Sequence, residues 1–360
     1  MLQRSAAQSV FLRHEWFDAA WQWRREDSQL NVLCVFRNNE LIGALPLLTA
    51  GHARAATRAR RLELLTVPDT QSCDLLAIRG EEAAVAHACL ARLLEKPTGW
   101  DVLRLNYLRP DASALVHLAA AAGDEELSST VCDAGRNPLL SLQGDWKTFY
   151  DTRSRRLKKA NNLVGNRLRK AGSVRIEWLE PGCGNRETIA RSIDITIAIS
   201  ARSWKRDTGN SLDQPGPQAF LRRLSHHAAE CGWLSVWLLF LDEKPVAMEY
   251  ELIADGNVHA LRADFDAACV ETSPGSYLNR HLLEALYGRG YKHYFMGPGD
   301  NAYKFRWTDD AEPLTQLTIY GRGARARWLS AWERTLRPRL RELRDVLARM
   351  TQSAARPSAD

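Results

Sequence analysis

Residues 234–307 decide the fold, and their sequence is LSVWLLFLDEKPVAMEYELIADGNVHALRADFDAACVETSPGSYLNRHLLEALYGRGYKHYFMGPGDNAYKFRW. Three apolar runs occupy 234–241, 245–253 and 257–264, and the short polar turns Asp-Glu-Lys and Asp-Gly separate them. Apolar runs of this length between turn residues are typical of strands. The stretch therefore predicts a meander of three antiparallel strands.

A loop and a helix follow the meander. The loop is Thr272-Ser273-Pro274-Gly275-Ser276, and residues 277–287 then place four leucines on one side of a helical pattern. Backbone N–H groups at the start of a helix can bind a phosphate. The same loop can also be an ordinary capping turn, with Ser276 as the cap. The pattern is completed by a strand at 291–296, a short helix at 303–307 and a last strand at 315–320.

The part of the chain before residue 145 alternates short strands and helices. Residues 31–36 and 40–48 have strand character, and Asn38 and Asn39 between them tolerate the left-handed backbone of a hairpin turn. A helical pattern at 81–94 and a strand at 101–107 follow. This order favours a mixed α/β lobe.

A basic segment marks the middle of the chain. We predict one long helix there, capped by Asp145 at its start and ended by Gly172. Its cationic residues are Arg153, Arg155, Arg156, Lys158, Lys159, Arg167, Arg169 and Lys170. With the boundary at the start of this helix, the chain divides into an N-terminal lobe (1–144), a second lobe (145–323), a basic amphipathic helix (324–350) and a disordered tail (351–360).

The composition is that of a globular protein with a basic balance. The chain has 360 residues and a formal net charge of +6, which can favour nucleic acid, anionic lipid or a phosphorylated cofactor. The longest apolar stretch, 234–241, is far shorter than the ~20 residues of a membrane-spanning helix, and the first residues lack the apolar core of a signal peptide. We therefore expect a cytoplasmic protein.

The seven cysteines are scattered, with no close pair spaced for zinc or redox chemistry. Free cysteine is a small residue that is readily buried. We expect a reducing compartment, no metal centre and no catalytic cysteine.

The order of elements in residues 146–320 resembles the core of the GNAT superfamily of acyltransferases. More closely, it is similar to the acetyltransferases associated with cellulose and exopolysaccharide biosynthesis. The segments that carry this similarity are Ser154-Arg155-Arg156-Leu157, Arg202-Ser203-Trp204, Ala263-Asp264-Phe265, Ser273-Pro274-Gly275, Gly297, Tyr303-Lys304 and Trp307. The Gln/Arg-x-x-Gly-x-Gly/Ala signature of the wider superfamily is absent from the loop that precedes the helix.

The resemblance implies an α/β fold of tandem GNAT-like lobes, each a mixed, mainly antiparallel sheet flanked by helices. The hairpin at 40–47 resembles the strand pair of a degenerate N-terminal lobe, so the lobe at 145–323 is expected to be the catalytic one. The resemblance also implies transfer of an acyl group, acetyl first of all, from acyl-CoA to an amine or hydroxyl of a sugar-like or cell-envelope acceptor. Ser273, Gly275 and Ser276 are then expected to bind the pyrophosphate of CoA. An acyl carrier protein presents the same phosphopantetheine arm, so the carrier stays open.

Acyl transfer needs a base for the acceptor proton and a proton source for the leaving thiolate. Asp264 and Glu249 are carboxylates in strands suited to burial, and burial raises a carboxyl pKa toward that of a base. A solvent-facing position is equally consistent with strand alternation, and we favour Asp264 of the two. His259 is another candidate base. Tyr303 lies where GNAT enzymes often place an acidic tyrosine, and it is the predicted acid.

Three further side chains are candidates for substrate contact. Lys304 and Arg306 can pair with phosphates or with an acidic acceptor, or they can form a solvated basic turn of helix. Trp204 belongs to one of the segments that carry the resemblance. These three residues complete the predicted site.

Two other functions fit the same sequence. Fem-type aminoacyl-tRNA transferases share paired GNAT lobes and a comparable basic segment, but we locate no lobe insertions of their kind and do not expect nucleic acid as a partner. A scaffold in a polysaccharide-assembly complex, with both lobes inactive, is the non-enzymatic alternative. The Trp/Leu stripe of 324–350 can pack against the lobes or make a peripheral contact with the inner membrane.

Overall fold

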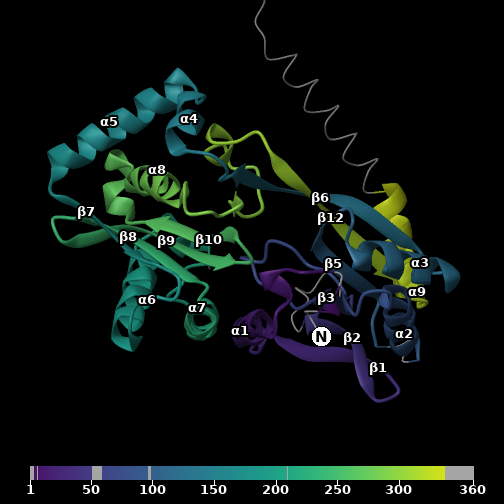
Figure 1. Cartoon of the computed structure of the whole chain (residues 1–360). Helices are drawn as coiled ribbons and strands as arrows, with labels where there is room; N and C mark the ends of the chain where they lie inside the picture. The colour runs from purple at the N-terminus through teal and green to yellow at the C-terminus, as the bar shows by residue number, and fades with distance from the viewer. Residues whose placement is uncertain (1–3, 6, 51–58, 96–98, 209, 337–360) are drawn as a thin grey trace, which may run out of the picture.

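The protein is described by a computed structural model that covers the chain except residues 1–3, 6, 51–58, 96–98, 209 and 337–360 (Figure 1). The elements of the first half are α1 (His14–Arg24), β1 (Ser28–Arg37), β2 (Glu40–Ala50), β3 (Arg61–Leu64), β4 (Leu76–Ala77), α2 (Glu82–Leu94), β5 (Val102–Leu108), α3 (Ala119–Asp124) and β6 (Ser129–Ser141). The predicted mixture of strands and helices is confirmed.

The second half begins with two helices and contains the meander. Its elements are α4 (Trp146–Asp151), α5 (Arg155–Ala171), β7 (Val174–Leu179), α6 (Arg186–Ala201), α7 (Pro215–Glu230), β8 (Leu234–Leu241), β9 (Lys244–Ala254), β10 (Asn257–Phe265), α8 (Pro274–Leu286), β11 (His293–Phe295), β12 (Ala311–Tyr320) and α9 (Ala324–Ala331). None of the helices in the described ranges is both long enough and apolar enough to cross a membrane.

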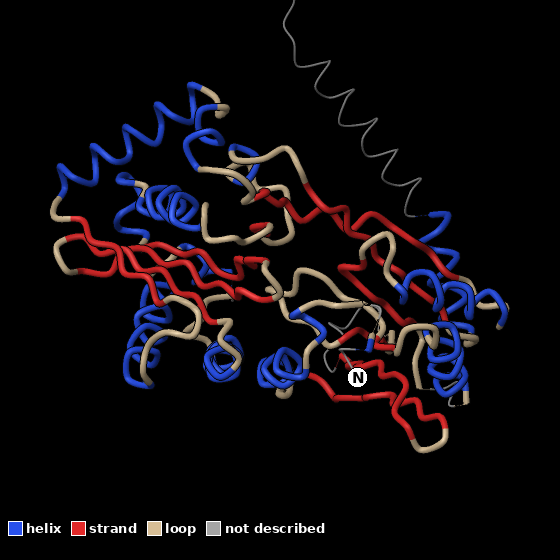
Figure 2. Tube along the Cα trace, in the orientation of Figure 1, coloured by secondary structure: helices blue, strands red, loops and turns tan. Residues whose placement is uncertain are grey.

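The strands form one continuous sheet that runs through both halves of the molecule (Figure 2). Its order is β1-β2-β3-β5-β12-β6-β11-β10-β9-β8-β7, and β4 pairs with β2. β12 comes late in the chain but lies between β5 and β6, antiparallel to both. The last residues of β6 pair instead with β11. β6 therefore joins the two halves of the sheet.

The hairpin turns follow the predicted chemistry. Asn38 and Asn39 both have positive φ, 50° and 63°, in the turn between β1 and β2. Asp255 and Gly256, with φ of 54° and 78°, make the corresponding turn between β9 and β10. Two consecutive left-handed residues match the twist of a hairpin, and Asn, Asp and Gly adopt them most easily.

Helices cover both faces of the β7–β10 half of the sheet. On one face, α6 and α7 pack on β8 and β9, and α1 from the start of the chain lies beside α7 (Figure 1). Trp16 of α1 meets Phe220 of α7 edge to face, with ring centroids 5.4 Å apart. On the other face, α8 packs with Leu278, Leu282 and its other leucines, and α5 crosses above it. The first and second halves of the chain thus share one hydrophobic core.

The structure corrects the prediction of one long basic helix. The chain leaves helical geometry after Asp151, and a second helix begins at Arg155. Asp145 caps the first helix as predicted, accepting a hydrogen bond from the Thr148 amide, and Ser154 caps the second by accepting one from the Leu157 amide. The second helix ends before Gly172, where a Cβ would lie 2.2 Å from the Asp242 carboxylate.

The C-terminal helix and the loop before α8 also differ from expectation. α9 covers residues 324–331, a π-helical turn follows to residue 336, and the remainder of the predicted helix and the tail lie outside the described residues. The predicted loop at 272–276 contributes its last three residues to α8, which begins at Pro274. A short 3₁₀ helix, Ala267–Thr272, precedes it. Proline suits the first position of a helix because it lacks the N–H that would go unpaired there.

The position of β12 yields a prediction about the proposed division at residue 144. A fragment of residues 1–144 loses β12, whose Leu317 and Ile319 are fully buried in the core of the first half. It also leaves β6 without a partner on either edge. We expect this fragment to be unfolded or aggregated when it is produced alone. Co-expression with residues 145–336 should restore a folded complex. Circular dichroism with thermal unfolding measures both, and cooperative unfolding of the isolated fragment would contradict the prediction.

Candidate active site

β10 separates from its neighbour β11 halfway along its length. β11 pairs in parallel with only Asn257, Val258 and His259, whereas β9 pairs with β10 through Phe265. A β-bulge interrupts the register with β9 between Ala260 and Arg262. The β10 edge beyond the bulge therefore has no strand partner on the β11 side. Bulges of this kind often re-aim side chains next to active sites.

Glu249 of β9 lies buried beside the bulge, with 3% of its surface exposed. Its carboxylate accepts a hydrogen bond from the Tyr294 hydroxyl of β11 and one of 3.5 Å from the Asn279 amide of α8. Burial raises the pKa of Glu249 to about 7, although these hydrogen bonds and the charge of Lys205 lower it. A carboxyl with this pKa can take and release a proton near neutral pH.

Glu251 lies two residues further along β9, on the same face as Glu249. It is fully buried, and its Oε2 accepts hydrogen bonds from Ser235 Oγ (2.9 Å) and Trp237 Nε1 (3.1 Å). Its Oε1 has no hydrogen-bond partner in the described structure. Burial, and next the charge of Glu249, raise the pKa of Glu251 well above its ordinary value. Burial therefore favours the neutral, protonated form of Glu251.

Asp264 of β10 lies on the opposite face of the sheet from Glu249. It pairs across the strands with Met248, whose side chain belongs to the core beneath α6 and α7. Its buried carboxylate accepts a 2.9 Å hydrogen bond from the Ser200 hydroxyl and forms a 2.5 Å ion pair with Lys205 Nζ. Lys205 also donates to the Ala263 carbonyl at 3.2 Å. Asp264 thus holds a lysine at the unpaired edge of β10.

The loop after β11 brings Tyr303 and Lys304 to the bulge. Its Gly297 lies against β10, where a Cβ would be 3.5 Å from the Ala260 carbonyl oxygen. Lys304 is buried, and its Nζ donates to the carbonyls of Gly297 (2.7 Å) and Pro298 (3.2 Å), while burial lowers its pKa to about 8. Tyr303 is 45% exposed as a residue, but desolvation of its phenol and next the charge of Glu249 raise its pKa to about 12. The phenol is therefore protonated at neutral pH, close to the Glu249 carboxyl.

The beginning of α8 lies at the far end of the same strand. Ser273 has a left-handed backbone (φ 52°) and occupies the N-cap position, with no side-chain capping bond. Ser276 was the predicted cap, but it is an exposed residue of the first turn, and its N–H bonds to the Ser273 carbonyl at 3.1 Å. A Cβ at Gly275 would lie 3.3 Å from Phe265 Cδ1 at the end of β10. The unpaired strand edge leads directly to this turn.

The structure thus gathers most of the predicted residues along β10. Glu249, Asp264, Tyr303 and Lys304 surround the bulge, and Ser273, Gly275 and Ser276 lie at the end of the strand. Arg306 and Trp204 are exposed, and Trp204 begins the 3₁₀ helix Trp204–Thr208 that carries Lys205. His259 is stacked on Phe295, with ring centroids 4.9 Å apart, and burial lowers its pKa to about 4, so it is neutral.

Sequence reasoning missed several residues of this cluster. They are Lys205, Tyr294, Glu251, Asn279 and the buried ion pair of Arg262 with Asp69, in which nitrogen and oxygen lie 2.8 Å apart. Asp69 comes from the first half of the chain, so no local pattern could link it to β10. The glutamate at 251 was the one visible signal, because it is a second charged residue in the otherwise apolar run of β9.

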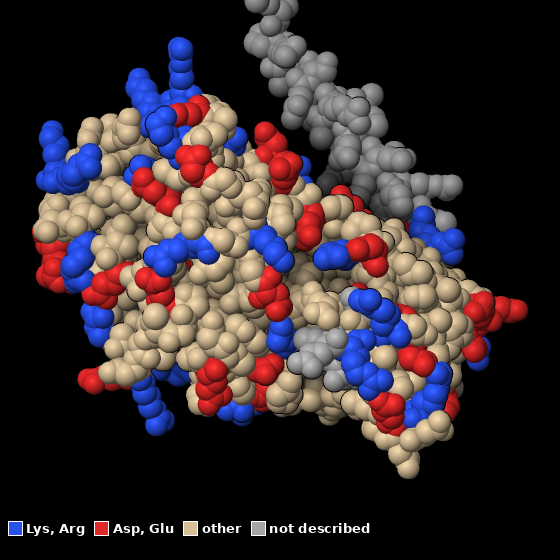
Figure 3. Space-filling model, viewed as in Figure 1, with Lys and Arg blue, Asp and Glu red and all other residues tan. Residues whose placement is uncertain are grey.

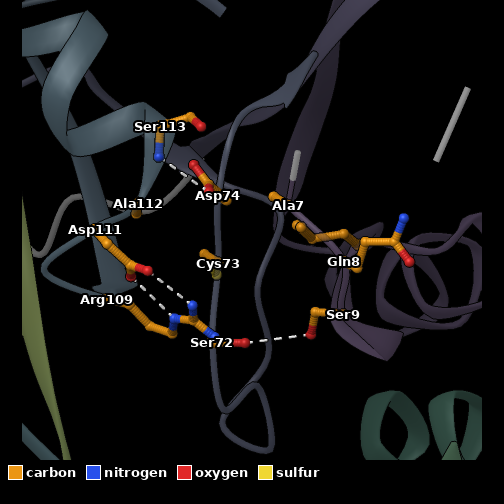
Figure 4. A pocket seen from close by; sticks show the side chains of 11 residues that line it. Ala7, Gln8, Ser9, Ser72, Cys73, Asp74, Arg109, Asp111, Ala112 and Ser113 are labelled. Carbon is orange, nitrogen blue, oxygen red and sulfur yellow. Dashed lines mark hydrogen bonds and ion pairs between the residues drawn. The ribbon is translucent and has the colours of Figure 1, made fainter. Parts of the chain in front are cut away.

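A cavity of about 270 Å³ lies between the N-terminal segment and the loops around Cys73 and Arg109 (Figure 4). Figure 4 shows Arg109 paired with Asp111, and Asp74 accepting a hydrogen bond from the Ser113 amide. A smaller adjoining hollow is lined by side chains that include Gln71, Asn137, Asn257 and His259. Gln71 donates to the Ala260 carbonyl at 2.8 Å, which connects this hollow to the bulge. The described residues contain no group of three or more potential metal ligands.

A comparison with protein families matches residues 154–305 to the Acetyltransferase (GNAT) domain. Residues 154–305 are therefore a GNAT-type domain, and the chain is an acyltransferase. A search of curated proteins returned no match to the sequence.

Solved structures share the fold over most of their length. The C-terminal domain (DUF2156) assigned as a lysylphosphatidylglycerol synthetase from Agrobacterium fabrum is 14% identical, with a TM-score of 0.54 over 86% of this chain and 89% of that one. FemX is 10% identical, with a TM-score of 0.53 over 89% and 94%. L-PGS from Bacillus licheniformis is 13% identical, with a TM-score of 0.51 over 89% and 96%. At these identities the likeness concerns the fold alone.

The raised pKa of Glu251 has a consequence for stability. A carboxyl that is protonated when folded and ionised when unfolded costs stability as the pH rises above its unfolded pKa. Glu251→Gln removes this cost, so we expect its thermal midpoint to exceed that of the wild type by a few degrees at pH 8 and to match it near pH 4. Calorimetry at the two pH values measures the difference.

Glu243→Gln is the matched control. Glu243 is exposed and paired with Arg175, which lowers its pKa, so its substitution should leave the midpoint at pH 8 unchanged or slightly lower. An equal gain in both variants would show that burial of Glu251 is not the cause.

Proposed function

We propose that the chain transfers an acyl group, acetyl in the simplest case, from acyl-CoA to an amine or hydroxyl of a sugar-like or cell-envelope acceptor. We place this reaction in the cytoplasm, in polysaccharide biosynthesis. The observation that carries the proposal is the unpaired edge of β10, which runs from a bulge flanked by Glu249 and Tyr303 to the first turn of α8. The GNAT domain supports the reaction class.

The donor arm fits the unpaired edge of β10. The pantetheine arm carries amide groups that can hydrogen-bond to an open strand edge as a further strand would. Its pyrophosphate then comes to the first turn of α8, where Ser273, Gly275 and Ser276 lie and the helix dipole favours an anion. Lys205 occupies part of this edge through its bond to Ala263, so donor binding requires it to yield that bond.

Glu249 and Tyr303, which flank the bulge, take the roles of base and acid. The acceptor nitrogen or oxygen attacks the thioester carbonyl, its proton passes to Glu249, and the carbon–sulfur bond breaks. Tyr303 donates a hydrogen bond to the departing thiolate, because its raised pKa keeps the phenol protonated. We assign the base to Glu249 rather than Asp264, since Asp264 is committed to Lys205 and Ser200 on the other face.

The acceptor fits the hollow beside Gln71. Its lining offers amides and a neutral imidazole, namely Gln71, Asn137, Asn257 and His259, together with the charged residues Arg109, Asp255 and Glu312. Arg109 and Asp255 are ion-paired with other residues, so the amides, the imidazole and the Glu312 carboxyl are the groups available to a hydroxyl- or amine-bearing ligand. Arg306 and Trp204 are exposed and available to a larger acceptor.

Ligand-dependent thermal stability tests the reaction class. Acetyl-CoA should raise the unfolding midpoint, and charged tRNA should not. Stabilisation by charged tRNA alone would favour an aminoacyl-tRNA-dependent transferase. No response to either donor would favour an inactive scaffold.

The pH dependence identifies the base. Glu249 must be deprotonated to accept a proton, so kcat/KM should rise with pH through about 7 and then level off. Glu249→Gln should remove this rise and lower kcat about 10²–10⁴-fold. Asp264→Asn is the companion variant: it should lower kcat and keep the rise near pH 7. If Asp264→Asn abolishes the rise and Glu249→Gln keeps it, the base is Asp264.

Tyr303→Phe tests the acid. Loss of the phenol should reduce kcat about 10²-fold and leave the Kd of acetyl-CoA nearly unchanged, because only the transition state uses the hydrogen bond. Stopped-flow turnover and calorimetric titration measure the two quantities. Donors with more acidic thiol leaving groups should lose less rate in this variant, and an equal loss for all donors would speak against a role at the thiolate.

A further inference from the structure

α5 carries an unusually one-sided charge. From Thr152 to Ile176 the sequence contains no Asp or Glu, and α5 alone carries seven Lys and Arg residues. Its apolar side packs inward through Leu157 and Leu168, so the cations project outward. Figure 3 shows basic side chains extending from the edge of the molecule where Figure 1 places α5.

Many of the cations of α5 lack ion-pair partners within the described structure. Several exposed arginines elsewhere on the surface form local ion pairs, as Arg92 does with Glu95 and Arg322 with Glu125. On α5, Arg155, Arg156, Lys159 and Lys170 are exposed and have no ion pair or hydrogen bond with any described residue. Two of them occupy the first turn, where the helix dipole disfavours positive charge. The helix dipole makes this arrangement locally unfavourable, and an anionic ligand would offset that cost.

The position of α5 associates this charge with the donor. α5 crosses α8 at its beginning, where a Cβ at Gly165 would lie 3.6 Å from Tyr277 Cε2. The exposed Arg167 donates to the Glu271 carbonyl at 3.4 Å, two residues before the cap of α8. The basic face therefore borders the turn to which the unpaired edge of β10 leads.

We infer that the outer face of α5 docks an acidic carrier protein, which delivers the acyl group on its phosphopantetheine arm to the edge of β10. This inference rests on the proposed acyl transfer. The arm enters at the first turn of α8 and runs along the edge of β10 to the bulge. There the acceptor nitrogen or oxygen bonds to the acyl carbon, the carbon–sulfur bond breaks and the acceptor proton passes to Glu249. The arm leaves as a thiolate that then takes up a proton, so that one proton is transferred overall from acceptor to thiol. Free acyl-CoA presents the same arm without the docking surface.

The face fits a folded acidic protein better than a membrane or a nucleic acid. α5 turns Leu157 and Leu168 inward and exposes one large apolar side chain, Leu163, so it offers little surface for insertion into lipid. It exposes no aromatic side chain on which bases could stack. The basic face lies beside the donor site and is complementary in charge to an acidic protein. Such complementarity speeds the docking of a charged partner.

The test compares two donors in one variant of the full chain. In Arg155→Gln, Arg156→Gln, Lys159→Gln and Lys170→Gln combined, kcat/KM for an acetylated acyl carrier protein should fall about tenfold or more. That for acetyl-CoA should stay within about twofold, because its arm needs no docking face. The loss with the carrier should shrink as the salt concentration rises.

A matched variant removes the same charge elsewhere. Arg37, Arg92, Arg222 and Arg322 are exposed and ion-paired, and their combined change to Gln should leave the kcat/KM of both donors within about twofold of wild type. Circular dichroism and the thermal midpoint verify that both variants are folded.

The outcomes separate this inference from the proposed function. Equal use of the carrier by wild type and the α5 variant overturns the docking face while acyl transfer stands. So does an equal loss with both donors. α5-dependent binding to phosphatidylglycerol vesicles or to RNA, without an effect on the carrier, assigns the face to another partner and also overturns the inference. Absence of transfer from either donor in the wild type refutes the proposed function itself.

Discussion

The pairing of β6 with two different strands is the constraint on which the site depends. Its first part holds β12 in the sheet of the first half, and its last residues hold β11. The same strand continues to fix the chain after β11, because the Met296 amide bonds to the Pro138 carbonyl and the Gly299 amide to the Arg136 carbonyl. These two hydrogen bonds hold Gly297 in contact with the bulge of β10. Tyr303 and Lys304 follow in a loop whose starting point is set by β6.

The second constraint is the placement of two carboxyl groups in the core. Glu249 and Glu251 share one face of β9, and burying ionised groups there is expensive unless they are paired or neutral. Hydroxyl, amide and indole groups on this face donate hydrogen bonds to the two carboxyls. Neither carboxyl forms an ion pair with a described residue. Burial therefore disfavours charge on both at once: hydrogen bonds from Tyr294 and Asn279 and the charge of Lys205 lower the pKa of Glu249, whereas the charge of Glu249 raises that of Glu251. A base with a pKa near 7 results from the burial itself.

Local patterns predicted the meander, its turns and α8, because these depend on apolar periodicity and on residues that tolerate positive φ. β6 was not predicted, since its sequence STVCDAGRNPLLS is largely polar and contains a glycine and a proline. It is a strand because β12 and β11 supply partners from far along the chain. The place of β12 between β5 and β6 depends on the same long-range pairing.

The residues of the candidate site also differ in whether the sequence alone could predict them. Glu249 and Asp264 were identifiable as charged residues in apolar strands, but the cross-strand register decides which face each occupies, and that register is set by a bulge with no sequence signal. Lys205 lies in a segment that has the composition of a loop. Its role as the partner of Asp264 emerges only when the 3₁₀ helix packs beside β10.

The shared core also decides how the two substrates can meet. The donor edge belongs to the second half of the chain, whereas Gln71 and Asp69, which contact β10 beside that edge, belong to the first. Gln71 is 1% exposed, and the Arg262–Asp69 pair is buried at both ends, so a rotation of one half against the other would break buried polar contacts at once. The distance between donor and acceptor is therefore a property of the packed core. Selection of the acceptor then depends on the side chains that line its hollow and on movements of short surface segments, such as the one that carries Lys205. It does not depend on closure of two hinged lobes.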